Sequence, residues 1–386
     1  MVRAVGYAYP WDYLDDPGAA PRAAELGIDV VALAASYHAS RAVSPLHPTR
    51  RVRDVRESAL YVPVREEAWR GRRLAPRSPA WSDDDNLFAH ARDQLVAVGL
   101  QVHAWVVLTH HDDLGYSNRD LVVRNAFAET YDYALCPSSP EVVEYCLTLV
   151  EEVRASSSCS GVVLEACGPM GVEHASQHDK LEFARWSATA ARLLSLCFCD
   201  TCRSGMSCAG LDVDELSRRV RHGVDDGADS MHEALGATLA AEVAAFRSGV
   251  TTNFRRAVVA RLLEASPDLS ITLHASASEW ATGSSPSLGD VGSLAGVTAV
   301  VANCWHPSSA EQELGDMRDL IEGKCDLGAY LRMDGGWNEM STIDQALERY
   351  RGIGLDEVHL YHLGLLSHTG VADLARVVGL AKNGTR

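Results

Sequence analysis

The chain has 386 residues, of which 47% are hydrophobic, so it is long enough to bury a large core. Its net charge is −17 at pH 7, and no basic cluster contains interleaved aromatic residues, which argues against nucleic acid or an anionic membrane as a partner. No signal-like N-terminus and no run of about 18 apolar residues occurs, so we expect a cytoplasmic protein without a membrane partner. The ten cysteines are then expected to be thiols or metal ligands rather than disulfides. The sequence is compatible with a homo-oligomer.

Short apolar runs alternate with helix-like segments along the chain, which is typical of parallel βα units. The predicted strands are 3–9, 29–35, 101–108, 161–166, 270–276, 297–303, 326–333 and 357–363. The predicted helices are 19–26, 86–98, 139–154, 179–196, 230–265, 310–323, 342–352 and 371–380. Glycines at 236 and 249 suggest that the segment 231–265 contains two helices in series. Eight strand–helix units predict an α/β fold, a (β/α)8 TIM barrel that forms one domain over residues 1–386.

The connections after the second, third and fourth predicted strands are long. They cover 36–85, 109–138 and the residues from 167 onward, where a Cys-rich insertion extends around 167–230. In a barrel these connections form the rim that binds substrate, and long ordered loops are usually functional. We therefore expect the functional site at the carboxyl ends of the strands.

The segment 161–165, GVVLE, is predicted to be a buried strand that ends in a carboxylate. A buried carboxylate is costly without a role or a partner, and barrel enzymes place catalytic groups at this end of a strand. We interpret Glu165 as a general acid/base, the alternative being an ion pair with a neighbouring arginine.

A second carboxylate follows the seventh predicted strand, on the opposite side of the ring. Glycosidic cleavage uses two facing carboxyl groups, so we predict that Asp334 is the nucleophile. Glu279 is the rival for this role. Arg332 and Asp334 could instead form a structural ion pair.

Aromatic, histidine and amide side chains gather at the same predicted strand ends or in the loops that follow. Flat aromatic faces with polar donors suit a sugar ring, although any one of these aromatic residues could serve packing alone. The predicted substrate-binding residues are Tyr37, His38, His103, Trp105, His110, Asn125, His178, His274, Asn303, Trp305, Arg332 and Tyr361. We expect a small carbohydrate substrate and no organic cofactor.

A cysteine run, C-x-C-x2-C, occupies Cys197, Cys199 and Cys202, and Cys208 follows it. Four thiolates can bind Zn2+ tetrahedrally, and such a structural ion contributes folding free energy. We predict a structural Zn2+ held by these four cysteines. Cys167 or another distant residue could replace Cys208, and unligated cysteines beneath a loop are the remaining alternative.

Residues 100–170 resemble the barrels known as family 10 glycosylhydrolase-like. The resemblance is carried by HAW at 103–105, the proline segment 136–140 with the helix after it, and SGVVLEA at 160–166. Glu165 stands where those barrels usually have Asp. The cysteine run is similar to that of family 42 β-galactosidases, which follows the fourth strand and binds a structural zinc. The resemblance implies a barrel with glycoside hydrolase activity.

The predicted function is hydrolysis of a small glycoside through Glu165 and Asp334. A metal-dependent isomerase or lyase of a sugar-like substrate, using the His-rich rim, is the alternative from another enzyme class. A sugar-binding barrel without catalysis is the third possibility.

Overall fold

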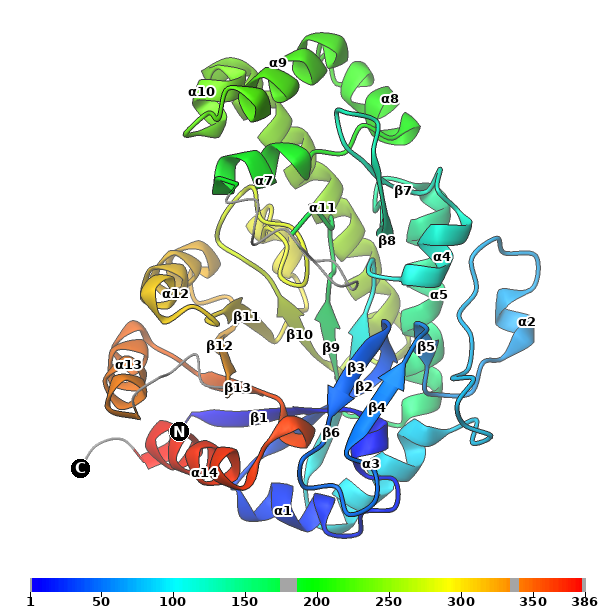
Figure 1. The fold of residues 1–386 in the computed structure, drawn as a ribbon, viewed down its shortest axis with the longest axis vertical. Helices are drawn as coiled ribbons and strands as arrows, with labels where there is room; N and C mark the ends of the chain where they lie inside the picture. The colour runs from blue at the N-terminus through cyan, green and yellow to red at the C-terminus, as the bar shows by residue number, and fades with distance from the viewer. Residues whose placement is uncertain (1, 174–185, 334–339, 384–386) are drawn as a thin grey trace.

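The computed structural model describes residues 2–173, 186–333 and 340–383. Eight parallel strands form a closed barrel (Figure 1). They are β1 (Arg3–Ala8), β2 (Val30–Tyr37), β6 (Gln101–Val107), β9 (Gly161–Glu165), β10 (Ser270–His274), β11 (Ala299–Asn303), β12 (Asp326–Arg332) and β13 (Glu357–Tyr361). The ring closes because β1 pairs in parallel with both β2 and β13. The predicted (β/α)8 TIM barrel is confirmed, strand by strand.

The barrel strands are buried on both faces, which explains why they appear in the sequence as continuous apolar runs. In β9 every residue is buried. Small residues make room for large ones in the interior: a Cβ at Gly161 would lie 2.6 Å from the ring of His103. The barrel is therefore filled by side chains rather than open.

Helices surround the ring, as the alternating pattern predicts (Figure 1). They are α1 (Ala19–Glu25), α3 (Leu87–Ala97), α5 (Pro140–Ser157), α11 (Ala237–Ala265), α12 (Pro307–Ile321), α13 (Met340–Ile353) and α14 (His368–Asn383). The predicted division of 231–265 is confirmed, since Gly236 at φ 76° separates α10 (Met231–Leu235) from α11. Gly249 lies within α11 and does not interrupt it. Part of the predicted helix 179–196 lies outside the described residues, and α7 (Ala188–Leu194) is within them.

The long connections carry their own secondary structure. After β2 come the hairpin of β3 (Ser40–Val43) and β4 (Val52–Val55), then β5 (Ala59–Leu60), which pairs antiparallel with β2, and α2 (Glu66–Trp69). After β6 come α4 (Asp112–Ser117) and the hairpin of β7 (Val122–Arg124) and β8 (Thr130–Leu135).

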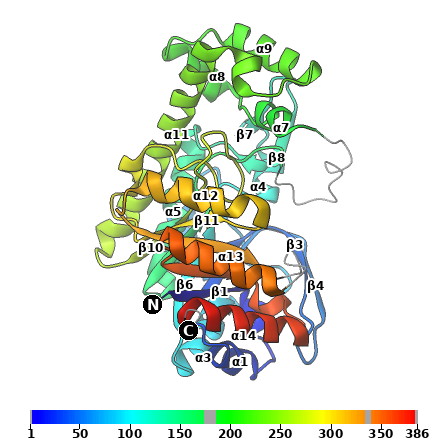
Figure 2. The ribbon, with the colours of Figure 1, turned by 90° about the vertical axis from the view of Figure 1, so that its left-hand side faces the viewer.

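The Cys-rich insertion forms a helical group at the end of the molecule farthest from α1 (Figures 1 and 2). It contains α7, α8 (Asp200–Cys208), α9 (Val213–Asp225) and α10. Leu216, Val220 and Leu235 belong to a hydrophobic cluster that includes several of the cysteines and is separate from the main core. Within the described part of the chain, no helix has the length and apolar character needed to span a bilayer.

Candidate functional site

Glu165 is the last residue of β9 and is only 5% exposed at the carboxyl end of the barrel. Burial raises the pKa of Glu165 to about 8, and the hydrogen bond donated by Trp105 partly offsets this increase. Trp105 Nε1 lies 2.8 Å from Glu165 Oε2. No arginine or lysine among the described residues forms an ion pair with Glu165, so its carboxyl group is protonated at neutral pH and available as a proton donor.

Aromatic side chains surround this carboxyl group. Trp105 packs edge-on against Tyr7 and Tyr37, with ring centroids 4.9 and 4.7 Å apart. The charge of Glu165 is close enough to raise the pKa of Tyr361, adding to the effect of burial. These tyrosines therefore stay neutral, and the carboxyl group lies in a setting of rings and hydroxyl groups.

Two adjoining cavities open at this end of the barrel and share Tyr361 and Leu365. The first is about 570 Å³ and the second about 350 Å³, both within the size range of small-molecule sites. The first is lined by residues that include Trp305, Arg332, Met333, His362, Thr369 and Asp373. The second is lined by residues that include Tyr9, Tyr37, His38, Ser40 and Arg41. Together we call them the rim cleft.

Five of the predicted substrate-binding residues lie at or beside the rim cleft. Tyr37, His38, Trp305, Arg332 and Tyr361 line it. The Trp305 ring lies 5.3 Å from the Tyr361 ring, and the Arg332 guanidinium carbon lies 5.3 Å above Trp305. Asn303 stands behind them, because its Oδ1 accepts the backbone N–H of Trp305 at 2.9 Å.

His103 and His274 are not brought to the rim cleft. His274 is fully buried, and its Nε2 lies 2.6 Å from Tyr7 Oη inside the barrel. His103 packs against Gly161, and burial lowers its pKa to about 4. It shares a strand face with Trp105, as period-two alternation predicts. However, two residues along a strand are separated by about 6.6 Å in the direction of the strand. His103 therefore lies deeper, toward the amino end.

Asn125 also lies away from the rim cleft. Its Oδ1 accepts backbone N–H groups of Phe127 and Glu129, and its Nδ2 donates to Tyr131 Oη. These bonds stabilise the turn between β7 and β8, which is a common role of asparagine in tight turns. Its place in a long loop gave no signal that distinguished a turn residue from a ligand-binding one.

The second carboxylate of the predicted pair, Asp334, lies outside the described residues, as does His178. Its rival Glu279 is exposed in the connection after β10. Asp12, which the sequence analysis did not single out, is buried near the same end of the barrel. Burial raises the pKa of Asp12 to about 7, although the Tyr9 N–H donates to it at 2.8 Å. No sequence pattern distinguished it from other loop aspartates.

His38, His110 and Asp112 form a cluster at the rim in which one ligand atom from each lies within 4.8 Å of the others. Two imidazoles and a carboxylate suit a transition metal. His38 Nδ1 bonds to Ala39 O at 2.8 Å, which leaves Nε2 as the possible ligand atom. However, the two rings stack 4.0 Å apart at 16°. Stacked rings hold their lone pairs in nearly parallel planes, so chelation of one ion requires a ring to rotate.

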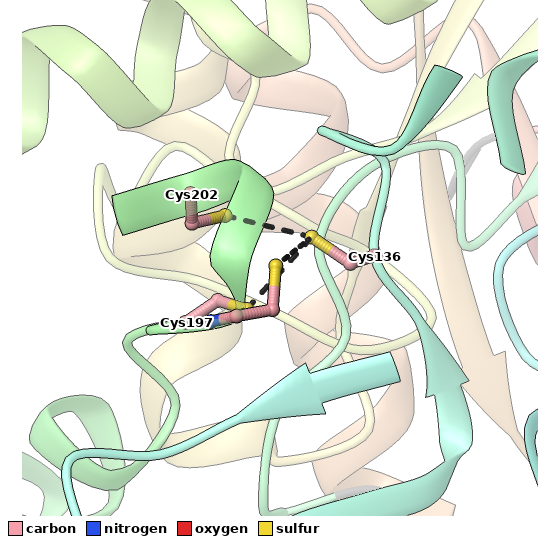
Figure 3. Close-up of side chains that lie close together, drawn as sticks. Cys136, Cys197 and Cys202 are labelled. Atoms are coloured by element: carbon pink, nitrogen blue, oxygen red, sulfur yellow. Dashed lines mark hydrogen bonds between the residues drawn. The ribbon is translucent and has the colours of Figure 1, made fainter. Parts of the chain in front are cut away.

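A second cluster is made of four cysteines, Cys136, Cys197, Cys199 and Cys202 (Figure 3). The sulfur of Cys136 lies 3.5 Å from that of Cys202, 3.7 Å from that of Cys199 and 3.8 Å from that of Cys197. Four thiolates at one point are the donor set of a structural tetrahedral Zn2+ site, so these residues fit the predicted ion.

The fourth member corrects the sequence prediction. Cys208 is exposed at the last residue of α8, roughly 9 Å along the helix from Cys202, and it lies outside the cluster. Cys167 is buried elsewhere, and Arg255 Nε donates to its carbonyl. Cys136 follows β8 and approaches from the opposite side. Because Cys136 is far from the C-x-C-x2-C run in the sequence, the cysteine spacing did not identify it as the fourth member.

No protein-family model and no curated protein matches the chain. Several solved glycoside hydrolase structures match its fold. The PgaB (BpsB) glycoside hydrolase domain from Bordetella bronchiseptica is 14% identical, with a TM-score of 0.60 over 98% of this chain and 99% of that one. α-L-fucosidase isoenzyme 2 from Paenibacillus thiaminolyticus is 10% identical, with a TM-score of 0.58 over 98% of this chain and 49% of that one. The chain thus spans about half of the fucosidase.

A β-galactosidase from Bacillus circulans sp. alkalophilus is 11% identical, with a TM-score of 0.55 over 99% of this chain and 56% of that one. At such identities the likeness establishes a shared barrel fold and nothing finer. It therefore confirms neither the family 10-like resemblance nor the likeness of the cysteine run to that of family 42 enzymes.

Proposed function

We propose that this protein is a glycoside hydrolase that acts on a small glycoside, with Glu165 as the acid/base and Asp334 as the nucleophile. One observation carries the proposal: a carboxyl group with a pKa of about 8 ends a barrel strand, and its partner Trp105 packs against Tyr37, which lines the rim cleft. Acid catalysis of glycoside cleavage needs a carboxyl group that is still protonated at working pH. The fold shared with solved glycoside hydrolases supports the same reaction class.

The Trp105 hydrogen bond gives the two carboxyl oxygens of Glu165 different roles. Trp105 Nε1 donates to Oε2, so the acidic proton is best placed on Oε1, from which it can pass to the leaving glycosidic oxygen. After the transfer, the same N–H stabilises the carboxylate, since hydrogen bonds to charged acceptors are stronger. A second carboxylate then attacks the anomeric carbon or activates water.

The two lobes of the rim cleft suit sugar groups on either side of the cleaved bond. They meet at Tyr361, whose ring lies 6.5 Å from that of Trp105, the hydrogen-bond partner of Glu165. Trp305 and Tyr361 in one lobe, and Tyr9 and Tyr37 in the other, supply ring surfaces for C–H groups of a sugar.

We also infer that residues 1–386 act as one domain, with the Cys-rich insertion around 167–230 stabilised by a Zn2+ ion. Cys136 takes the place predicted for Cys208 in this site. The ion would supply folding free energy and no chemistry, because four cysteines leave no open coordination position.

The test is turnover of a panel of aryl α- and β-glycosides by the wild type and by Glu165→Gln. Glu348→Gln, exposed on α13, is the matched control. We expect turnover of one sugar type by the wild type and a loss of about 10²-fold or more in Glu165→Gln only. No turnover of any glycoside would contradict the hydrolase proposal. Sugar binding that survives without turnover would instead indicate the non-catalytic barrel.

A second candidate function is a metal-dependent isomerase or lyase acting on a sugar-like substrate, favoured by the cluster of His38, His110 and Asp112. Its test is whether any activity requires an added divalent cation and is lost in His110→Ala. Activity that survives both chelation and His110→Ala would exclude it.

A further inference from the structure

Two polar groups lie next to sulfur atoms of the cysteine cluster. Cys202 Sγ donates to Ser138 Oγ at 3.2 Å, and the Cys199 backbone N–H donates to Cys197 Sγ at 3.5 Å. A thiol is a weak acceptor, whereas a thiolate is charged and attracts such donors strongly. If Cys202 loses its proton, the Ser138 hydroxyl can become the donor, so this hydroxyl and the backbone N–H can both stabilise sulfurs that carry negative charge.

Arg247, on α11, is next to this cluster. It lines an apolar cavity together with Cys136, Cys197 and Cys202. Cys202 and Cys197 are near enough for a negative charge on their sulfurs to stabilise the Arg247 guanidinium. The cationic side chain thus comes from the barrel side, while three of the four cysteines come from the insertion.

Within the described part of the chain, Arg247 has no carboxylate partner. There its Nε atom is enclosed without a hydrogen bond, and its Nη2 donates to the carbonyl of Trp280 at 3.4 Å. The guanidinium carbon lies 5.7 Å from the Trp280 ring. Among the residues that the structure describes, none offers it a carboxylate oxygen within salt-bridge distance. A partly buried guanidinium without nearby negative charge is unfavourable, and the sulfurs of Cys202 and Cys197 are the larger sources of it, ahead of Glu279.

Charge balance gives the arrangement a physical reason. Four thiolates around a divalent cation carry a net charge of about −2 in a poorly hydrated setting. One guanidinium offsets part of this negative charge. Four neutral thiols would carry no charge for the guanidinium to offset. Outer groups of this kind orient metal ligands and tune metal affinity.

We propose that Arg247 is a positioning residue that compensates the charge of a metal-bound tetrathiolate and thereby links α11 to the Cys-rich insertion. The role requires all four cysteines to be thiolates with a divalent ion between them. It does not depend on the glycoside hydrolase proposal, since neither the rim cleft nor Glu165 takes part.

The experiment uses the full chain loaded with Zn2+ or Co2+. Zinc affinity is measured by competition with a chromophoric chelator for the wild type, Arg247→Leu and Arg247→Lys. Arg256→Leu is the control, because Arg256 is an exposed arginine on the same helix. We expect zinc affinity to fall about 10-fold to 100-fold in Arg247→Leu, less in Arg247→Lys, and not at all in Arg256→Leu.

The Co2+ form supplies a spectroscopic readout that a merely structural arginine would not affect. In the wild type we expect thiolate-to-cobalt absorption typical of four sulfur ligands, and in Arg247→Leu a shift of these bands. Unchanged affinity and spectrum in Arg247→Leu, or fewer than four sulfur ligands in the wild type, would overturn the proposal. If Arg247→Leu does not fold, Ser138→Ala tests the donor arrangement, with a fall of a few-fold in zinc affinity expected and no change contradicting it.

Discussion

Trp105 Nε1 donates a hydrogen bond to Glu165 Oε2 across 2.8 Å, and the two residues come from neighbouring strands of the barrel. Burial and this bond act in opposite directions on the pKa of Glu165: burial raises it, and the bond lowers it. With a net pKa of about 8, the carboxyl group holds its proton near neutral pH and can still donate it.

Trp105→Phe should move the pH dependence of catalysis in a defined direction. Loss of the donor removes the effect that lowers the Glu165 pKa, so the alkaline limb of kcat/KM should shift to higher pH. The rate should also fall about tenfold, since the carboxylate formed after proton transfer loses a hydrogen bond. Trp69→Phe, at another buried indole, should leave the profile unchanged. An unmoved alkaline limb in Trp105→Phe would show that Glu165 is not the titrating acid.

The stability of the wild type relative to Glu165→Gln should depend on pH. The folded-state pKa of Glu165, about 8, lies above the unfolded value of roughly 4.3, so the folded state binds the proton more tightly. This stabilisation is complete below the unfolded pKa and is lost as pH rises toward the folded pKa. Thermal melts between pH 5 and pH 8 should therefore show that the Tm of Glu165→Gln increases relative to that of the wild type as pH rises. A constant difference would refute the raised pKa.

Removal of the proposed zinc should destabilise the folded chain. Cys136→Ser should lower both bound zinc and Tm, whereas Cys208→Ser should change neither, because Cys208 is exposed and outside the cluster. A strong chelator should lower the Tm of the wild type and have little further effect on Cys136→Ser. Equal effects of the two serine variants would contradict the assignment of Cys136.

Two glycine substitutions should change stability in opposite directions. Gly161→Ala should destabilise the chain by about 1–3 kcal/mol, because the new Cβ would lie 2.6 Å from the enclosed His103 ring. Gly249→Ala should stabilise it by about 0.5–1 kcal/mol, since nothing lies within 4 Å of its Cβ position in α11. Urea unfolding measures both, and a stabilising Gly161→Ala would show that the barrel interior has spare room at His103.

The sequence by itself determined the order and type of the barrel elements. The eight strands, the helix boundary at Gly236 and the position of Glu165 at a strand end could all be predicted, because each depends on residues a few positions apart. Continuous apolar burial, helical periodicity and the conformational freedom of glycine are local properties, and the closed ring follows from repeating one βα unit.

Only the tertiary structure decided which side chains meet. Cys136 joins Cys197 across 61 residues of chain, while the nearer Cys208 points elsewhere along α8. His103 and Trp105 share one strand face, yet only Trp105 reaches Glu165, because depth in a barrel depends on the register of neighbouring strands. Contacts between distant segments depend on the packing of the whole chain, and the spacing of residues in the sequence does not predict them.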